Sequence, residues 1–137
     1  MLGAETPRTV FASNEVASIV MPPWSSTRED RRHSSLRALF DAFTDGSYVT
    51  IAEDPYDKHA RAILARVDPI AEEIWDFRCL DPNPGIRAFG CFSETDTFIA
   101  LTWDYRENID DWPGEVDLCK KEWKGFSAIS HPTKGRS

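Results

Sequence analysis

The spacing of apolar residues changes period twice along this chain of 137 residues. Apolar residues first recur at helical spacing, then fill three strand-like segments separated by turn residues, and finally return to helical spacing. The clearest helical stripe is formed by Leu36, Leu39, Phe40 and Phe43. This order predicts a single α+β domain in which an antiparallel β-meander is flanked by helices.

The helices are expected over residues 27–44, 55–67 and 112–126. Ser26 is the expected N-cap of the first helix, because Glu29 three residues later completes a capping box. Gly46 is its expected stop, since glycine readily adopts the left-handed conformation that ends helices.

The meander is expected over residues 73–80, 86–92 and 97–103, and a further short strand over 48–51. Trp75 and Phe77 share one face of the first strand and should pack between the sheet and a helix. The third strand is apolar at nearly every residue from Phe98 to Leu101, so both of its faces should be covered.

Three segments divide the chain at the sequence level. Residues 1–24 are expected to be an extension with little fold of their own, since Met21 offers an alternative start. Residues 25–130 form the predicted domain, and 131–137 a tail. No run approaches the ~20 apolar residues of a membrane span, and the first residues lack the features of a signal peptide. We therefore expect a cytoplasmic protein without a membrane partner.

The cysteines and histidines do not form a ligand set. Cys79, Cys91 and Cys119 are odd in number and lack CxxC spacing, so small buried hydrophobic side chains are expected instead of disulfides, a metal or a cofactor. His33 is expected on the polar side of the first helix, and His131 in the tail.

His59 follows Lys58 and precedes Arg61 by two residues, so it is a candidate general base of a nuclease. A histidine on the surface of a helix is the simpler interpretation.

The charge is acidic and unevenly distributed. The formal net charge is −7, and the segment from Asp41 to Asp117 holds 18 acidic and 6 basic residues. Nucleic-acid binders usually have an overall basic balance. The acidic segment is either ordinary solubilising charge or a surface that docks on a basic partner. The basic residues between Arg28 and Arg37 alternate with acids, which favours pairing along the helix.

An arginine lies in each of the first two strands of the meander, and Arg106 follows the third. Over residues 55–106 this pattern resembles the RelE/HigB-type toxin superfamily, including its phage-derived branch. The matching segments are Trp75-Asp76-Phe77-Arg78, Gly85-Ile86-Arg87-Ala88-Phe89 and Phe98-Ile99-Ala100-Leu101.

The resemblance implies a RelE-like fold and metal-independent, ribosome-dependent cleavage of mRNA. Arg78 and Arg87 match positions of phosphate-binding or transition-state-stabilising arginines, and Arg106 and Tyr105 fit the segment after the last strand. The partners implied are RNA or the ribosome and an antitoxin or other protein. For Arg78 and Arg87, cross-strand pairing with Asp76 or Glu73 is the structural alternative.

The chain departs from the family after the third strand. Members usually carry basic residues there, whereas Asp104, Glu107, Asp110 and Asp111 occupy this segment. Acids at these positions would repel phosphate. They favour the alternative function, a non-catalytic acidic interaction or inhibitor protein of phage or mobile-element origin.

Overall fold

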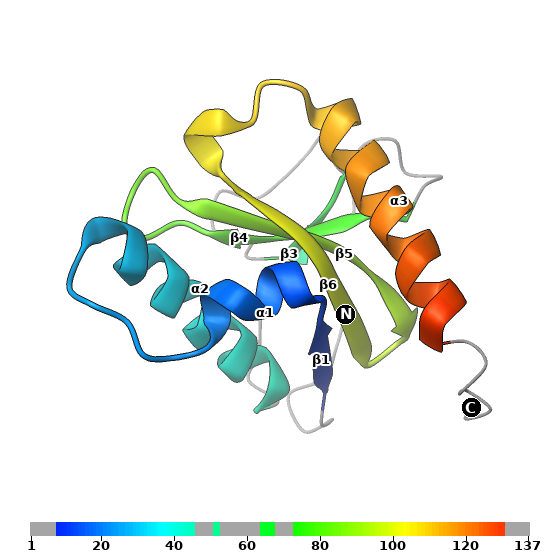
Figure 1. Cartoon of the computed structure of the whole chain (residues 1–137), viewed down its shortest axis with the longest axis horizontal. Coiled ribbons are helices and arrows are strands. Elements are labelled where there is room, and N and C mark those ends of the chain that lie inside the picture. Colours follow the sequence, from blue (N-terminus) through cyan, green and yellow to red (C-terminus); the bar gives the residue numbers. More distant parts are fainter. Residues whose placement is uncertain (1–7, 46–50, 53–63, 68–72, 131–137) are drawn as a thin grey trace.

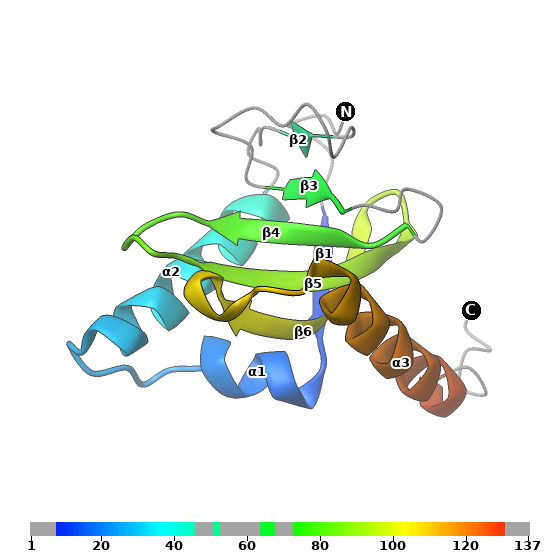
Figure 2. The same ribbon diagram turned by 90° about the horizontal axis from the view of Figure 1, so that it is seen from above.

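The computed structural model describes residues 8–45, 51–52, 64–67 and 73–130, with backbone alone at 51–52 and 126–130. These residues form an α+β structure in which helices lie on both faces of a six-stranded sheet (Figures 1 and 2). In chain order the elements are β1 (Thr9–Ala12), α1 (Asn14–Val20), α2 (Arg28–Thr44), β2 (Ile51–Ala52), β3 (Leu64–Arg66), β4 (Trp75–Cys79), β5 (Ile86–Glu94), β6 (Thr97–Tyr105), the 3-10 turn η2 (Arg106–Asn108) and α3 (Trp112–Ser130).

The predicted meander is present as β4, β5 and β6, and none of residues 86–103 is helical. The sheet as a whole is mixed, with strand order β1-β6-β5-β4-β3-β2. β1 pairs in parallel with β6, and β2 in parallel with β3, while the neighbours from β3 to β6 are antiparallel. The expectation of a purely antiparallel sheet is therefore wrong, because short strands from outside the meander extend both of its edges.

Two apolar cores lie on opposite faces of the sheet. The α2-side core joins α1 and α2 to the sheet; it contains Val16, Ile19, Val20, Leu36, Phe40, Phe43, Leu64, Trp75, Phe77, Cys79, Ile86, Ala88, Phe98 and Ala100. The α3-side core joins α3 to the sheet; it contains Val67, Ile74, Phe89, Ile99, Leu101, Ile109, Val116 and Cys119. The predictions for Trp75 and Phe77 are confirmed, and β6 is covered on both faces as expected.

The N-cap of helix α2 lies one residue later than the predicted cap, Ser26. The N-cap is Thr27, whose side-chain oxygen accepts a hydrogen bond from the backbone N–H of Asp30 at 3.1 Å. The Asp30 carboxylate in turn accepts two bonds from Ser25 at 2.7 Å, one from its backbone N–H and one from its hydroxyl. Ser26 is therefore not the cap, and Gly46 lies outside the described residues.

The prediction of a helix over 55–67 is wrong at its C-terminal end. Residues 64–66 form β3, and Leu64 pairs with Phe77 of β4. A run of three residues cannot distinguish helical from strand periodicity, so the hydrogen bonds offered by β4 decide. Residues 55–63 and 48–50 lie outside the described residues, while Ile51 begins β2.

The N-terminal segment is part of the fold instead of an extension. Residues 9–20 form β1 and α1, and Val16, Ile19 and Val20 are buried in the α2-side core. β1 has four residues and pairs with a strand that is almost 90 positions away, so no local pattern could reveal it. The folded unit therefore starts before residue 25.

A β-bulge in β6 sets the direction of the side chains that follow it. Gly90 pairs with Ala100 and Phe89 with Thr102, so Leu101 is an extra residue. A side chain at position 90 would collide with the carbonyl oxygen of Ile99, which explains the glycine. After the bulge, Trp103 packs against the α2-side core.

Candidate functional site

Three segments meet at the end of the sheet where β4 and β6 end and β5 begins. The backbone N–H of Arg106 donates to the carbonyl oxygen of Gly85 at 2.9 Å. The Arg28 guanidinium, in the first turn of α2, donates to the carbonyl oxygen of Asn83. The start of α2, the loop between β4 and β5, and the turn η2 therefore form one surface.

Two of the predicted arginines lie side by side on the α3 face of the sheet. Arg78 of β4 is the cross-strand partner of Arg87 of β5. Burial lowers the pKa of Arg87; the Asp76 carboxylate opposes that shift, while the charges of Arg78 and Arg106 reinforce it. Arg78 and Arg106 thus both lie within electrostatic range of Arg87.

Arg87 has the cross-strand ion pair considered as its structural alternative. Its Nε lies 3.6 Å from Oδ2 of Asp76, and the two side chains are 8% and 1% exposed. A buried carboxylate requires such a counter-charge, because water cannot solvate it. This ion pair gives Arg87 a structural role, and its catalytic role remains a prediction.

Arg78 and Arg106 are more accessible than Arg87. Arg78 is half-buried. Arg106 is exposed, with its guanidinium carbon 5.4 Å from the ring centre of Trp112.

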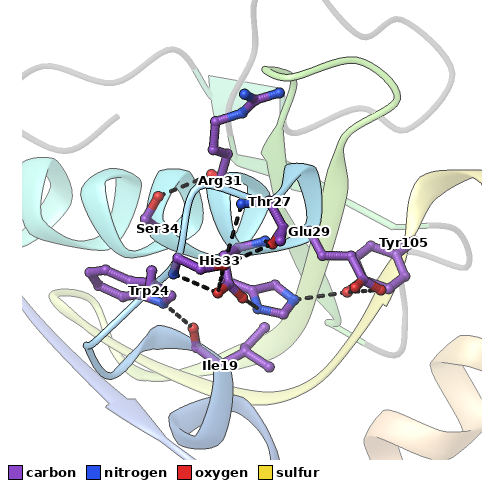
Figure 3. Close-up of polar contacts among 10 residues, drawn as sticks. Ile19, Trp24, Thr27, Glu29, Arg31, His33, Ser34 and Tyr105 are labelled. Carbon is purple, nitrogen blue, oxygen red and sulfur yellow. Dashed lines mark hydrogen bonds and ion pairs between the residues drawn. The ribbon is translucent and has the colours of Figure 1, made fainter.

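Tyr105, the fourth predicted site residue, points to the α2 face of the sheet. Its hydroxyl lies 2.8 Å from Nε2 of His33, as Figure 3 shows. The two rings are stacked with centroids 5.9 Å apart, and Trp103 packs edge-on against both. The structure therefore separates Tyr105 from Arg78 and Arg87 and joins it to a histidine.

Charged side chains surround this histidine–tyrosine pair. Oδ1 of Asp30 lies 3.7 Å from Nδ1 of His33, and Oε2 of Glu29 lies 3.5 Å from the Tyr105 hydroxyl. The Arg32 guanidinium lies 4.6 Å from the centre of the Tyr105 ring and binds Glu107 at 2.9 Å. Acidic and basic groups thus alternate around the two rings.

Burial shifts the two titrating groups in opposite directions. Burial lowers the pKa of His33 below its ordinary value of 6.5, although Asp30 and Glu29 oppose the shift. Burial and the nearby Glu29 carboxylate raise the pKa of Tyr105. At neutral pH His33 is therefore a neutral base and Tyr105 a protonated acid.

The position of His33 differs from the expectation that it lies on the polar side of the helix. His33 is instead half-buried between α2 and β6. It precedes Leu36 by three residues and Phe40 by seven, which places it on the same helical stripe as the core residues. That spacing is the signal in the sequence that points to its burial. His59 and His131 lie outside the described residues.

A group of carboxylates lies where α1, β6 and α3 meet. The pKa of Glu115 is raised to about 7, first by burial and then by Asp104, which also hydrogen-bonds it. The pKa of Glu15 is raised by burial and by the charges of Glu122 and Asp104. We call these four residues the carboxylate junction: Glu15, Asp104, Glu115 and Glu122. Their carboxylates repel one another when ionised.

The cysteines match the expectation of small apolar side chains. All three are free thiols; Cys79 and Cys119 are buried, and Cys91 is half-buried. Burial raises the pKa of Cys91 to about 11 and that of Cys119 to about 12. Neutral thiols of this kind are poor nucleophiles.

Within the described ranges, no group of three or more His, Cys, Asp or Glu side chains is arranged to bind a metal ion. None of the helices in that part of the chain has the length and apolar character needed to cross a membrane. Comparisons of the chain with protein-family models, curated proteins and solved structures gave no match.

Proposed function

We propose that this protein is a divergent RelE-type toxin-like protein, which binds ribosome-associated mRNA at the arginine-bearing end of its sheet and cleaves it. The proposal joins the sequence resemblance over residues 55–106 to a chemical requirement. Cleavage by attack of a 2′-hydroxyl develops negative charge on phosphorus-bound oxygens, and arginine guanidinium groups stabilise such charge.

The observation that carries the proposal is the proximity of Arg78, Arg87 and Arg106. They come from β4, β5 and η2, and Arg87 lies within electrostatic range of both Arg78 and Arg106. Their combined charge exceeds that of the buried Asp76. Arg78 is half-buried and Arg106 is exposed, so both side chains are accessible enough to contact a phosphate.

The test compares RNA binding by the wild type and by the double variant Arg78→Ala/Arg106→Ala. Affinity for a labelled single-stranded RNA should fall in the variant. The slope of log K against log salt concentration should also fall, by ~0.7 for each phosphate that the variant no longer neutralises. Arg87 is left intact, because its removal would destabilise the buried Asp76.

The control is Arg37→Ala, which removes one positive charge from α2, whereas the double variant removes two. Arg37 is already engaged by Asp41, with Nε and Oδ1 3.0 Å apart, so RNA binding should not change. Induced expression of each variant in growing cells then tests toxicity. A wild type that neither binds RNA nor slows translation would refute the proposal.

The carboxylate junction favours a second candidate function, docking on a basic protein partner. Glu15 and Glu122 are exposed, and the pKa of Glu15 is raised first by burial and then by the charges of Glu122 and Asp104. A cationic partner would relieve that repulsion. Binding of such a partner should weaken strongly at high salt.

The second candidate is tested by a pull-down at low and high salt with the wild type and with Glu15→Gln/Glu122→Gln. A basic partner that is lost both at high salt and in the double variant supports docking at the junction. Equal retention by wild type and variant would place the binding surface elsewhere.

A further inference from the structure

The strand β1, dark blue in Figure 1, forms one edge of the sheet, and among the described residues it pairs with β6 alone. The backbone N–H of Thr9 donates to the carbonyl oxygen of Asp96 at 2.9 Å. The backbone N–H of Ser13 donates to the carbonyl oxygen of Ala100 at the same distance. The odd-numbered residues of this segment therefore direct their backbone groups toward β6.

The backbone groups of Val10 and Ala12 point away from the sheet, because successive residues of a strand direct these groups to opposite sides. No hydrogen bond between described residues uses the backbone N–H of Val10 or of Ala12. Both residues are only half-buried. Unpaired groups along an open strand edge are a template on which a further strand can pair.

The side chains at this edge are apolar on both faces of the sheet. Phe11 is in register with Ile99 of the α3-side core, yet its own side chain is 53% exposed. On the other face Val10 and Ala12 pack at the border of the α2-side core. A strand with β-branched side chains, placed beside β1, would cover this apolar surface.

The charge at the end of β1 is negative. Glu15 follows β1 by three residues, is exposed, and belongs to the carboxylate junction. Burial raises its pKa, and the charges of Glu122 and Asp104 raise it further. Lysine or arginine side chains from an added strand would reduce this repulsion. A second copy of the chain, whose net charge is −7, would bring more negative charge instead.

We propose that the outer edge of β1 binds an extended segment of a basic protein partner, which adds to the sheet as a further edge strand. The added strand pairs with Val10 and Ala12, covers Phe11 and places lysine or arginine side chains beside Glu15 and Glu122. This inference rests on the second candidate function, docking on a basic partner, and specifies how that partner binds.

The test titrates the full chain with a short synthetic peptide of alternating valine and threonine that carries lysines at both ends. Binding should slow the hydrogen exchange of the Val10 and Ala12 amides, measured by NMR. The Thr9 and Ser13 amides should change little, because neighbouring carbonyl groups already bind them. The same peptide with glutamate in place of lysine is the control and should not bind.

Two variants separate backbone pairing from charge. Ala12→Pro removes an outward N–H and leaves the bonds to β6 in place, so peptide affinity should fall about tenfold, the effect of one hydrogen bond whose partner is left unsatisfied. Glu15→Gln/Glu122→Gln should weaken binding and reduce its dependence on salt. Thermal melting verifies that each variant folds, and the exchange measurement on the wild type decides if Ala12→Pro does not.

The outcomes separate the inference from the second candidate function. A peptide that does not bind, or that binds without protecting the Val10 and Ala12 amides, overturns the inference. A basic partner that is retained by Ala12→Pro but lost in Glu15→Gln/Glu122→Gln also overturns it, and leaves docking at the junction intact. Protection of the same amides by self-association would make a second copy the occupant and overturn the choice of partner. The absence of any salt-sensitive basic partner in the pull-down refutes the second candidate function itself.

Discussion

Asp104 and Tyr105 are neighbours on β6, yet their side chains enter opposite electrostatic environments. Around Tyr105, acidic and basic groups alternate: Arg32 binds Glu107, and His33 lies between Tyr105 and Asp30. Around Asp104, burial and neighbouring carboxylates raise the pKa of Glu15 on α1 and of Glu115 on α3. One strand thus separates a charge-balanced network from a group of like charges.

The difference determines what each face can do. Alternating charges hold His33 and Tyr105 in defined positions, 2.8 Å apart, beside the ion pair of Arg32 and Glu107. In the carboxylate junction, like charges repel one another and so favour the binding of protons. The contribution of the junction to the free energy of unfolding therefore depends on pH. Four substitutions test this contrast, and their expected effects decrease in order.

Arg87→Ala should have the largest effect on stability. It removes the counter-charge of Asp76, which is 1% exposed, and breaking a buried ion pair in this way costs about 3–5 kcal/mol. Denaturant unfolding measures the loss. Adding Asp76→Ala should recover part of it, and a double variant no more stable than Arg87→Ala would contradict this account.

Gly90→Ala should disrupt the β-bulge that directs Asp104 and Tyr105 to opposite faces of the sheet. The new Cβ collides with the carbonyl oxygen of Ile99, so the backbone at the bulge must move, at a cost of about 1–3 kcal/mol. The directions of Asp104 and Tyr105 should change with it. Chemical shifts of the His33 ring report the second effect, and Gly125→Ala is the control, since a Cβ there meets no atom within 4 Å.

Glu115→Gln should stabilise the protein at pH 8 and have little effect at pH 4. The folded-state pKa is raised to about 7 from 4.5, so the stability linked to the bound proton is complete below 4.5 and is lost as the pH rises through 7. Solvent screening of this half-exposed group limits the gain to about 1 kcal/mol. Melting temperatures across this pH range would contradict the account if the difference did not grow with pH.

Tyr105→Phe should have the smallest effect on stability. It removes the hydrogen bond to His33 and the long 3.5 Å bond to Glu29, and it keeps the ring, so a loss of about 0.5 kcal/mol is expected for these partly exposed groups. The pKa of His33, followed by NMR titration, should change because its Nε2 loses a partner. A stability loss comparable to that of Arg87→Ala would show that the hydroxyl is mainly structural.

The local pattern of apolar residues was sufficient to predict an element where that element is long or where its apolar residues recur at a regular spacing. Leu36, Phe40 and Phe43 identify α2 because their helical spacing extends over two turns. The meander is visible because apolar segments alternate with turn residues that cannot continue a strand. Of the candidate site, the sequence named all three arginines and Tyr105, since charged and phenolic groups stand out among strand residues.

The periodicity of apolar residues predicted the wrong structure where pairing with a distant strand, or a single inserted residue, determines the conformation. β1 and β3 are too short to show a period, and they become strands because β6 and β4 offer them hydrogen-bond partners. Strict alternation would place Tyr105 on the face of Ile99 and Leu101. The bulge at Leu101 reverses that assignment, and Ser13, the N-cap of α1, binds the Leu101 carbonyl oxygen at 2.8 Å.

The sequence by itself therefore determined the fold class, the helices α2 and α3, the meander and the identity of the cationic residues. The tertiary structure alone decided that Arg87 faces Asp76, that Tyr105 faces His33, and that carboxylates from three elements meet. The reason is physical: periodicity and turn chemistry act over a few residues, whereas the face on which a side chain lies depends on register between segments that are distant in the chain.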